Sequence, residues 1–222
     1  MELNKIYCMD CIEGMKQLES ESVDLVVTDP PYNINLKPQR GLTDSIANDN
    51  MSDDDFKIFL HNTFKEVERI LKPNSFLIIF TGWSTIPLFR SVLDNYFTLK
   101  SMPIWVKNNF GIGYYTRPQY EPAFLYFKGK PKILQKPISD VWKFNRIFSP
   151  VHSCEKPIKL IRFILKSFGK EGQTVLDPFG GVGPVFKSAK ELNMNFIGFE
   201  LDQRYVDIAN KRLSQGNIQE WF

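Results

Sequence analysis

The chain has 222 residues, of which 43% are hydrophobic, 24% charged and 14% aromatic, and its formal net charge is +3. This length allows one sizeable α/β core and is short for two independent domains, while the composition excludes a disordered chain. The chain has no apolar run of about 18 residues, and its opening MELNKIYCMD has no signal-like pattern. It contains three cysteines, an odd number, so we expect a cytoplasmic protein with free thiols and no membrane contact.

The first half of the chain alternates apolar runs with amphipathic helical segments. The helix expected over residues 54–71 has Ser52 or Asp53 as its N-cap and ends before Pro73. A polar stretch punctuated by glycine and proline, residues 35–50, is typical of a long loop. The other elements predicted here are strands at 6–10, 23–28 and 76–80 and helices at 11–18 and 84–94.

The second half continues the alternation and adds one irregular segment. Residues 129–150 are basic and proline-spaced, with no clear period. Alternating strands and helices indicate parallel βαβ units. We therefore predict a single α/β domain over residues 1–222, with a doubly wound, mostly parallel, Rossmann-like sheet. The elements predicted here are strands at 100–106, 121–127, 174–177 and 195–200 and helices at 157–168, from 183 onward and at 203–213.

The charge is unevenly distributed along the chain. Residues 1–71 contain 7 Lys/Arg and 14 Asp/Glu, whereas residues 128–170 contain 11 Lys/Arg and 2 Asp/Glu. Such asymmetry is consistent with a basic surface that meets a polyanion. A solvated basic helix and loop explain the same counts equally well.

Two stretches have the position expected of a ligand site, at the carboxyl ends of predicted strands. TVLDPFGGVGPV, residues 174–185, ends a strand on Asp177 and turns into a helix through several glycines. Glu200 ends the next strand, where an acid can accept hydrogen bonds from ribose hydroxyls. The turn lacks the G-x-G-x-x-G spacing, and Asp177 would repel a diphosphate. S-adenosylmethionine fits better, although such a turn can also be only a packed corner.

Four motifs and the lead-in at the start of the chain together resemble those of the DNA amino-methyltransferases in which the catalytic motif precedes the cofactor motif. TDPPYN at 28–33 is similar to the D-P-P-Y motif, and LDPFGGVGPV is similar to D-P-F-x-G-S-G-T-T. HSCEKP at 152–157 resembles H-P-T-[EQ]-K-P, FIGFELDQRYVDIANKRL resembles the ribose-binding segment, and CMDC matches the usual G-D-C lead-in. The resemblance covers nearly the whole chain in the right order.

The resemblance implies methyl transfer from S-adenosylmethionine to an exocyclic amine of a base. An aromatic amine is a poor nucleophile, because its lone pair is delocalised. Asp29 and the carbonyl of Pro30 can accept hydrogen bonds from that amine and stabilise its developing charge. Pro31 helps to keep the turn rigid, and Tyr32 offers a face on which an extruded base can stack.

The resemblance also implies which residues hold the cofactor. Asp10 would contact the adenine, or cap a helix instead. Phe179 would pack near the cofactor or in the core. His152 would contact the cofactor or, alternatively, make a structural hydrogen bond. Val182, Pro184 and Val185 depart from the family pattern, as do Ser153 and Cys154. The cofactor residues are Asp10, His152, Lys156, Asp177, Phe179, Gly181, Gly183 and Glu200.

The acid in D-P-P-Y favours adenine-N6 over cytosine-N4, and the expected substrate is double-stranded DNA with a flipped adenine. RNA, a protein amide and a non-catalytic DNA-binding subunit remain alternatives. Residues 129–150 are a small candidate target-recognition insertion, and residues 35–50 a substrate-closing loop. We also expect a homodimer, a companion restriction enzyme and no metal. The expected DNA contacts are Tyr114, Arg117, Lys130, Lys132, Lys136, Lys143 and Arg146, with Trp142 nearby, while Phe144 and Phe148 are expected in the core or at a dimer contact.

Overall fold

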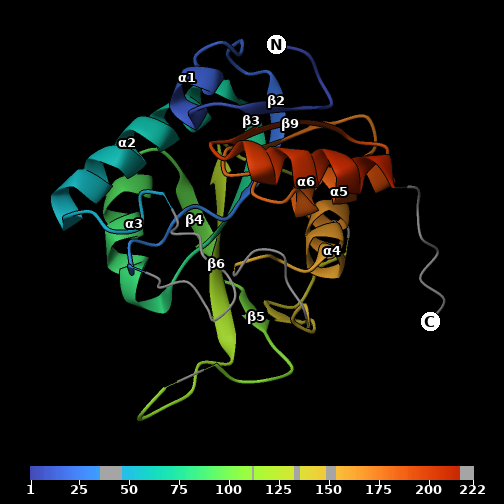
Figure 1. Ribbon diagram of the computed structural model, residues 1–222. Helices are drawn as coiled ribbons and strands as arrows, with labels where there is room; N and C mark the ends of the chain where they lie inside the picture. Colours follow the sequence, from blue (N-terminus) through green and yellow to red (C-terminus); the bar gives the residue numbers. More distant parts are fainter. Residues whose placement is uncertain (36–46, 112, 133–135, 149–153, 216–222) are drawn as a thin grey trace.

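The computed structural model describes residues 1–35, 47–111, 113–132, 136–148 and 154–215 (Figure 1). Strands and helices alternate over most of this length. The strands are β1 (Lys5–Cys8), β2 (Val23–Thr28), β3 (Leu71–Phe80), β4 (Thr98–Ser101), β5 (Ile104–Val106), β6 (Tyr120–Lys128), β7 (Val141–Lys143), β8 (Thr174–Asp177) and β9 (Asn195–Glu200). The helices are α1 (Cys11–Met15), α2 (Asp53–Ile70), the short 3-10 turn η1 (Trp83–Thr85), α3 (Ile86–Leu93), α4 (Ile158–Phe168), α5 (Pro184–Glu191) and α6 (Gln203–Ser214).

The strands form one mixed sheet in the order β1-β9-β8-β2-β3-β6-β5-β7, and β4 also pairs with β6. The five strands from β1 to β3 in this order are parallel. Strand β6 runs antiparallel to β3, and β5 runs antiparallel to β6. The prediction of a doubly wound, mostly parallel sheet is confirmed.

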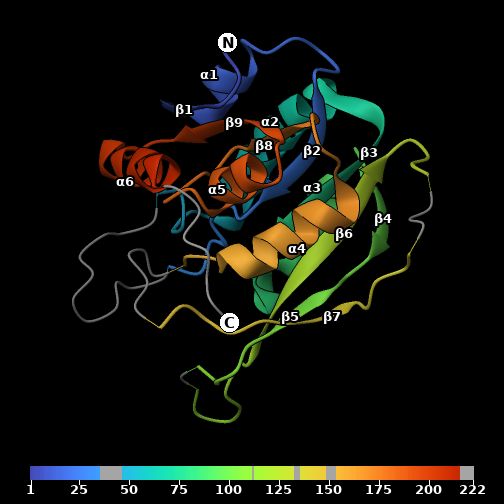
Figure 2. The ribbon, with the colours of Figure 1, turned by 90° about the vertical axis from the view of Figure 1, so that its right-hand side faces the viewer.

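Helices cover both faces of the sheet (Figure 2). Helices α1, α2 and α3 pack on one face, and α4, α5 and α6 pack on the other. Strand β2 shows why both faces are apolar: Val26 belongs to the first core, whereas its neighbours Leu25 and Val27 belong to the second. Successive side chains of a strand point to opposite faces, so a strand buried on both sides has a continuous apolar run.

Several predicted boundaries differ from the observed ones. Helix α2 ends at Ile70, before Pro73 as predicted, but the predicted start of the next strand at residue 76 is wrong. Strand β3 begins at Leu71 directly after the helix and includes Pro73, and the buried Leu71 pairs with Val23. The single strand predicted over residues 100–106 is two strands, β4 and β5, which pair with different parts of β6. Ser52 is the N-cap of α2, since its side chain accepts a hydrogen bond from the N–H of Asp55 (3.1 Å).

Parallel strands bring their carboxyl ends to one edge of the sheet, which we call the carboxyl edge. Because β6 is antiparallel to β3, the first residues of β6 lie at this edge. In the part of the chain that the structure describes, no helix combines the length and apolar character needed to span a bilayer.

Candidate active site

The segment TDPPYN forms a turn directly after β2, at the carboxyl edge. We call residues 29–32 the catalytic turn. Pro30 and Pro31 are buried, and Asp29 and Tyr32 are partly buried. The hydroxyl of Tyr32 donates a 2.5 Å hydrogen bond to Oδ1 of Asp29. Because each proline fixes φ and lacks an N–H group, this turn holds the carboxylate and the aromatic ring side by side.

A carboxylate from the segment before α2 supports the catalytic turn. Asp49 is 4% exposed, and its Oδ1 accepts hydrogen bonds from the N–H groups of Tyr32 (3.1 Å) and Ile34 (3.2 Å). Most of the predicted closing loop, residues 35–50, lies outside the described residues. Its described end therefore holds the turn, and closure over a base stays a prediction.

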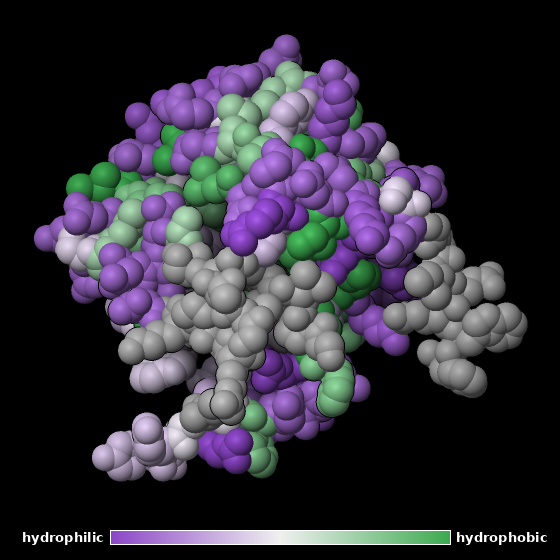
Figure 3. Space-filling model, in the orientation of Figure 1, coloured by the Kyte–Doolittle hydropathy of each residue, from purple (hydrophilic) through white to green (hydrophobic). Residues whose placement is uncertain are grey.

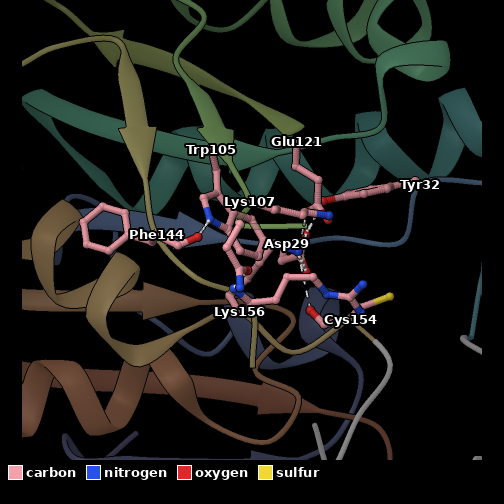
Figure 4. A network of polar contacts seen from close by, with 10 residues as sticks. Asp29, Tyr32, Trp105, Lys107, Glu121, Phe144, Cys154 and Lys156 are labelled. Carbon is pink, nitrogen blue, oxygen red and sulfur yellow. Dashed lines mark hydrogen bonds and ion pairs between the residues drawn. The ribbon is translucent and has the colours of Figure 1, made fainter. Parts of the chain in front are cut away.

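A buried network of charged side chains surrounds Asp29 (Figure 4). The ammonium of Lys156 forms an ion pair with Oδ2 of Asp29 and lies 3.1 Å from Oε2 of Glu121. The other carboxylate oxygen of Glu121 pairs with Lys107, which follows β5. Glu121 comes from the start of β6, and Lys156 precedes α4. Four separate chain segments therefore contribute to one network of alternating charge.

Burial and charge pairing set the protonation of this network. Burial acts to raise the pKa of Glu121, but the ammonium groups of Lys156 and Lys107 outweigh it and lower the pKa to about 2. Burial likewise raises the pKa of Asp29, and Lys156 acts against this. For Lys156 the two carboxylates outweigh burial and raise its pKa. Two carboxylates and two ammonium groups thus balance one another.

The glycine turn after β8 lies beside the catalytic turn. Asp177 is buried, and its Oδ1 accepts hydrogen bonds from the hydroxyl of Thr28 (2.8 Å) and the N–H of Phe179 (3.1 Å). Burial raises the pKa of Asp177 to about 7, against these hydrogen bonds. Phe179 is partly buried, and its ring lies 5.9 Å from that of Phe59. The core-packing interpretation of Phe179 is therefore confirmed, and a contact to the cofactor stays a prediction.

Two glycines of this turn require the left-handed conformation. Gly181 has φ +50, nothing lies within 4 Å of a Cβ built on it, and its N–H donates to Oε2 of Glu200 (2.9 Å). Gly183 has φ +82 and is the N-cap of α5, where a Cβ would lie 2.7 Å from the Cβ of Ala209. Glycine is therefore favoured at both positions by the backbone conformation, and at Gly183 it is also required for space.

Asp10 follows β1 at the same edge of the sheet. Its Oδ1 accepts hydrogen bonds from the N–H groups of Ile12 (2.9 Å) and Glu13 (3.1 Å), so it is the N-cap of α1. The N-cap interpretation is confirmed, and the contact with adenine stays a prediction. His152 lies outside the described residues.

One cavity of about 410 Å³ joins the two predicted sites. Asp10, Glu200 and Gly181 line one part of it, and Asp29 and the prolines of the catalytic turn line another. Carboxylates suit ribose and amino groups, and the open space beside Gly181 admits a ligand close to the backbone. The residues present therefore fit S-adenosylmethionine. The lining also includes Tyr32, Lys107, Glu121, Arg146, Lys156, Asp177 and Phe179.

Comparison with known proteins identifies this arrangement. The N6/N4 methyltransferase family, described as DNA methylase, matches residues 23–211. The chain belongs to this family. It is 30% identical over 241 residues to the type II methyltransferase M.HpaI of Haemophilus parainfluenzae, covering 94% of this chain and 74% of that protein. It is 26% identical to the DNA adenine methyltransferase YhdJ of Escherichia coli (strain K12), covering 92% and 80%.

Solved structures agree with this assignment. The M1.HpyAVI–SAM complex superposes with a TM-score of 0.71 at 26% identity, over 94% of this chain and 99% of that one. The PvuII DNA methyltransferase, which is cytosine-N4-specific, has the same fold, with a TM-score of 0.76 at 19% identity, over 96% and 87%. The protein is a DNA methylase that uses S-adenosylmethionine, as the motifs predicted.

The described basic residues that were predicted to contact DNA lie at different places on the methylase. The N–H of Lys130 donates to Asn74 at the edge opposite the carboxyl edge (2.8 Å). Lys143 ends β7 beside Val106, at the carboxyl edge, and Arg146 lines the cavity. Lys132 and Lys136 are exposed between these places, and residues 133–135 are outside the described residues. Of the candidate insertion, the described end with Arg146 lies at the cavity, and its contact with DNA stays a prediction.

The hairpin between β5 and β6 projects from the body of the methylase (Figures 1 and 3). Tyr114 is fully exposed, and Arg117 lies over the ring of Phe110, 4.5 Å from its centroid. Trp142, in contrast, is buried, and Phe144 packs against the core on that side, whereas Phe148 is fully exposed. Core packing is thus confirmed for Phe144 and excluded for Phe148, for which the alternative, a dimer contact, stays a prediction.

Sequence reasoning missed three residues of the site: Asp49, Lys107 and Glu121. Glu121 offered the clearest signal, because it is an acid at the start of an otherwise apolar predicted strand, EPAFLYF. A short segment without helical periodicity precedes that strand, which indicates a hairpin and hence an antiparallel strand starting at the carboxyl edge. Lys156 is one of the residues predicted to hold the cofactor. The structure places its ammonium between Asp29 and Glu121, and the assignment to the cofactor stays a prediction.

Proposed function

We propose that the methylase modifies the exocyclic N6 amine of adenine in double-stranded DNA after flipping the base. The observation that carries this proposal is the catalytic turn, in which Asp29 lines the cavity beside the ring of Tyr32. A carboxylate can accept a hydrogen bond from the amine, and an aromatic ring can stack on an extruded base. The likeness to a protein named DNA adenine methyltransferase supports the choice of adenine.

Asp29 and the backbone carbonyl of Pro30 hold the amine and raise its reactivity. Both accept its hydrogen bonds, which favours a lone pair localised on nitrogen and stabilises the positive charge that develops there. The rigid turn keeps these acceptors in place, so that most of the remaining rate comes from alignment. When bound, S-adenosylmethionine supplies an electrophilic methyl group, and its sulfur keeps the electron pair of the broken carbon–sulfur bond. The nitrogen forms the new bond with its lone pair and then loses one proton to solvent.

Contacts to DNA come from both sides of the cavity in this proposal. Lys143 and Arg146 neutralise phosphates near the catalytic turn, and the exposed hairpin with Tyr114 and Arg117 reaches the duplex beyond it. Lys130, Lys132 and Lys136 would add contacts farther away. A homodimer would place two such surfaces on one duplex. A companion restriction enzyme and a cytoplasmic location complete the proposal.

Cytosine-N4 is the second candidate, because the fold is shared with a cytosine-N4-specific enzyme. The same acceptors would serve either amine. The deciding assay incubates the protein with methyl-labelled S-adenosylmethionine and unmethylated DNA or RNA, and then identifies the labelled nucleoside. We expect label on adenine-N6 in DNA. Label on cytosine or in RNA would overturn the choice of substrate.

The same assay tests Asp29 with a matched control on the same strand. Asp29→Asn removes the charged acceptor, and we expect a loss of more than about a hundredfold in kcat with cofactor binding retained. Asp24, near the other end of β2, is a partly exposed carboxylate that pairs with Lys72 (2.7 Å). Asp24→Asn should keep full activity. Equal activity of both variants would refute the proposed role of Asp29.

A further inference from the structure

Asp29 meets the target amine with both oxygens already engaged. Oδ1 accepts the hydroxyl of Tyr32, and Oδ2 is paired with the ammonium of Lys156. A carboxylate oxygen has more than one lone pair, so an additional bond is possible. However, a fixed ammonium on Oδ2 repels the positive charge that methyl transfer creates on the amine nitrogen. The arrangement of Asp29 and Lys156 without substrate therefore differs from the arrangement that would best stabilise the transition state.

The carboxylate of Glu121 is a second partner for the ammonium of Lys156. Oε2 of Glu121 is buried and lies 3.1 Å from Nζ of Lys156, yet it accepts no hydrogen bond from the described residues. The side chain of Lys156 is 5% exposed, and its ammonium lies 5.1 Å from the ring centroid of Phe80 and 5.7 Å from that of Tyr32. Aromatic faces stabilise a cation without fixing its position.

The surroundings of Glu121 allow such a shift. Lys107 anchors Oε1 of Glu121 and fixes the carboxylate, so that Oε2 points to Lys156. A second cavity of about 40 Å³ borders Glu121, Lys107 and the segment with Cys154. Lys156 and Glu121 both line the larger cavity of about 410 Å³, which leaves the ammonium room to move between the two carboxylates.

We infer that Glu121 is a positioning residue: it takes over the ammonium of Lys156 when the target amine reaches Asp29. The ammonium keeps all its protons, breaks its hydrogen bond to Oδ2 of Asp29 and forms one to Oε2 of Glu121. The amine then donates to Oδ2. This inference rests on the proposed role of Asp29 as acceptor of the amine, and it applies to adenine and cytosine alike.

The test replaces Glu121 by glutamine, which keeps the shape and removes the charge that receives the ammonium. In Glu121→Gln we expect kcat to fall about tenfold or more, while the KM for DNA and the Kd for S-adenosylmethionine change by less than about twofold. Glu121→Asp, which keeps the charge, should recover part of the kcat. Glu66→Gln is the matched control, because Glu66 pairs with Arg69 outside the site (2.8 Å) and is 15% exposed; it should leave kcat unchanged.

The pH profile separates positioning from a structural role. The titratable groups that face Asp29 are Tyr32 in its own turn, Lys156, Glu121 from β6 and Asp177 from β8. Among them, the negative charge of Glu121 raises the pKa of Asp29. Glu121→Gln should therefore move the acid limb of kcat to lower pH, whereas Glu66→Gln should leave it in place.

A double variant separates positioning from charge balance. Glu121→Gln with Lys107→Gln removes one charge of each sign, so the net charge around Asp29 is restored but the receiving oxygen is still missing. A kcat that stays about tenfold low supports the inference, and recovery of kcat overturns it. Wild-type kcat in a folded, cofactor-binding Glu121→Gln also overturns it. Asp29→Asn is measured in parallel: if it remains active, the proposed function fails whatever Glu121 does.

Discussion

Protonation of Asp177 should make cofactor binding depend on pH. The buried carboxyl has a pKa of about 7, because burial outweighs its hydrogen bonds to Thr28 and to the N–H of Phe179. A neutral carboxyl cannot pair with the cationic amino group of S-adenosylmethionine, whereas the ionised form can. We therefore expect the cofactor to bind mainly to the ionised form and to displace one proton as it does so.

The magnitude follows from the fraction ionised. A group with a pKa of about 7 is about one tenth ionised at about pH 6 and about nine tenths ionised at about pH 8, so the affinity should rise about tenfold, or ~1.4 kcal/mol, over this range. The sign for stability is opposite. Because the folded pKa lies above the ordinary 3.8, the free protein is most stable below that value and loses stability as the pH rises through about 7.

Isothermal titration calorimetry of the wild type and Asp177→Asn measures both effects. The variant should bind more weakly than the wild type at about pH 8 and show no slope over this range. Titration in two buffers of different ionisation enthalpy counts the proton that the wild type releases. A wild-type affinity that does not change with pH, or a variant that keeps the slope, would refute the reasoning.

Two further predictions concern the glycine turn and the basic residues. Gly183→Ala should destabilise the fold by about 2–4 kcal/mol in chemical denaturation, because its positive φ is strained and its Cβ would contact Ala209. Gly172→Ala, with φ +80 and open space, isolates the backbone cost and should lose only about 1 kcal/mol; equal losses would contradict the steric argument. Lys143→Gln should reduce the slope of DNA affinity against salt by about 0.9, whereas Lys130→Gln, at the opposite edge, should reduce it by less. The same slope change in both variants would exclude a preferred contact at Lys143.

The sequence predicted the parallel core and the ligand edge because both depend on local patterns. An apolar run buried on both faces, such as the one that ends at Thr28, is recognisable without its neighbours. The motifs at Asp29 and Asp177 follow such runs directly, so their place at the carboxyl edge follows from strand direction alone. The cavity that joins them confirms this placement.

The contacts among side chains could not be predicted in the same way. Lys107, Glu121 and Lys156 are distant in sequence, and they meet because β6 enters the sheet antiparallel to β3. Their pairing depends on side-chain directions and on burial, which a single sequence does not encode locally. Strand β7, in the segment after β6, was not predicted for a related reason. It is only three residues long, and Trp142 is its single buried residue.

The base of the exposed hairpin has a consequence for how such methylases diversify. Lys107 and Gln119 exchange hydrogen bonds at this base, from the N–H of Lys107 (2.8 Å) and from the side-chain amide of Gln119 (3.0 Å). The Lys107–Glu121 ion pair closes it on the inner side. Insertions or exchanges beyond this closure are absorbed at the tip, since loop length has a small energetic cost. We therefore expect that the hairpin can be replaced as a unit without moving Asp29.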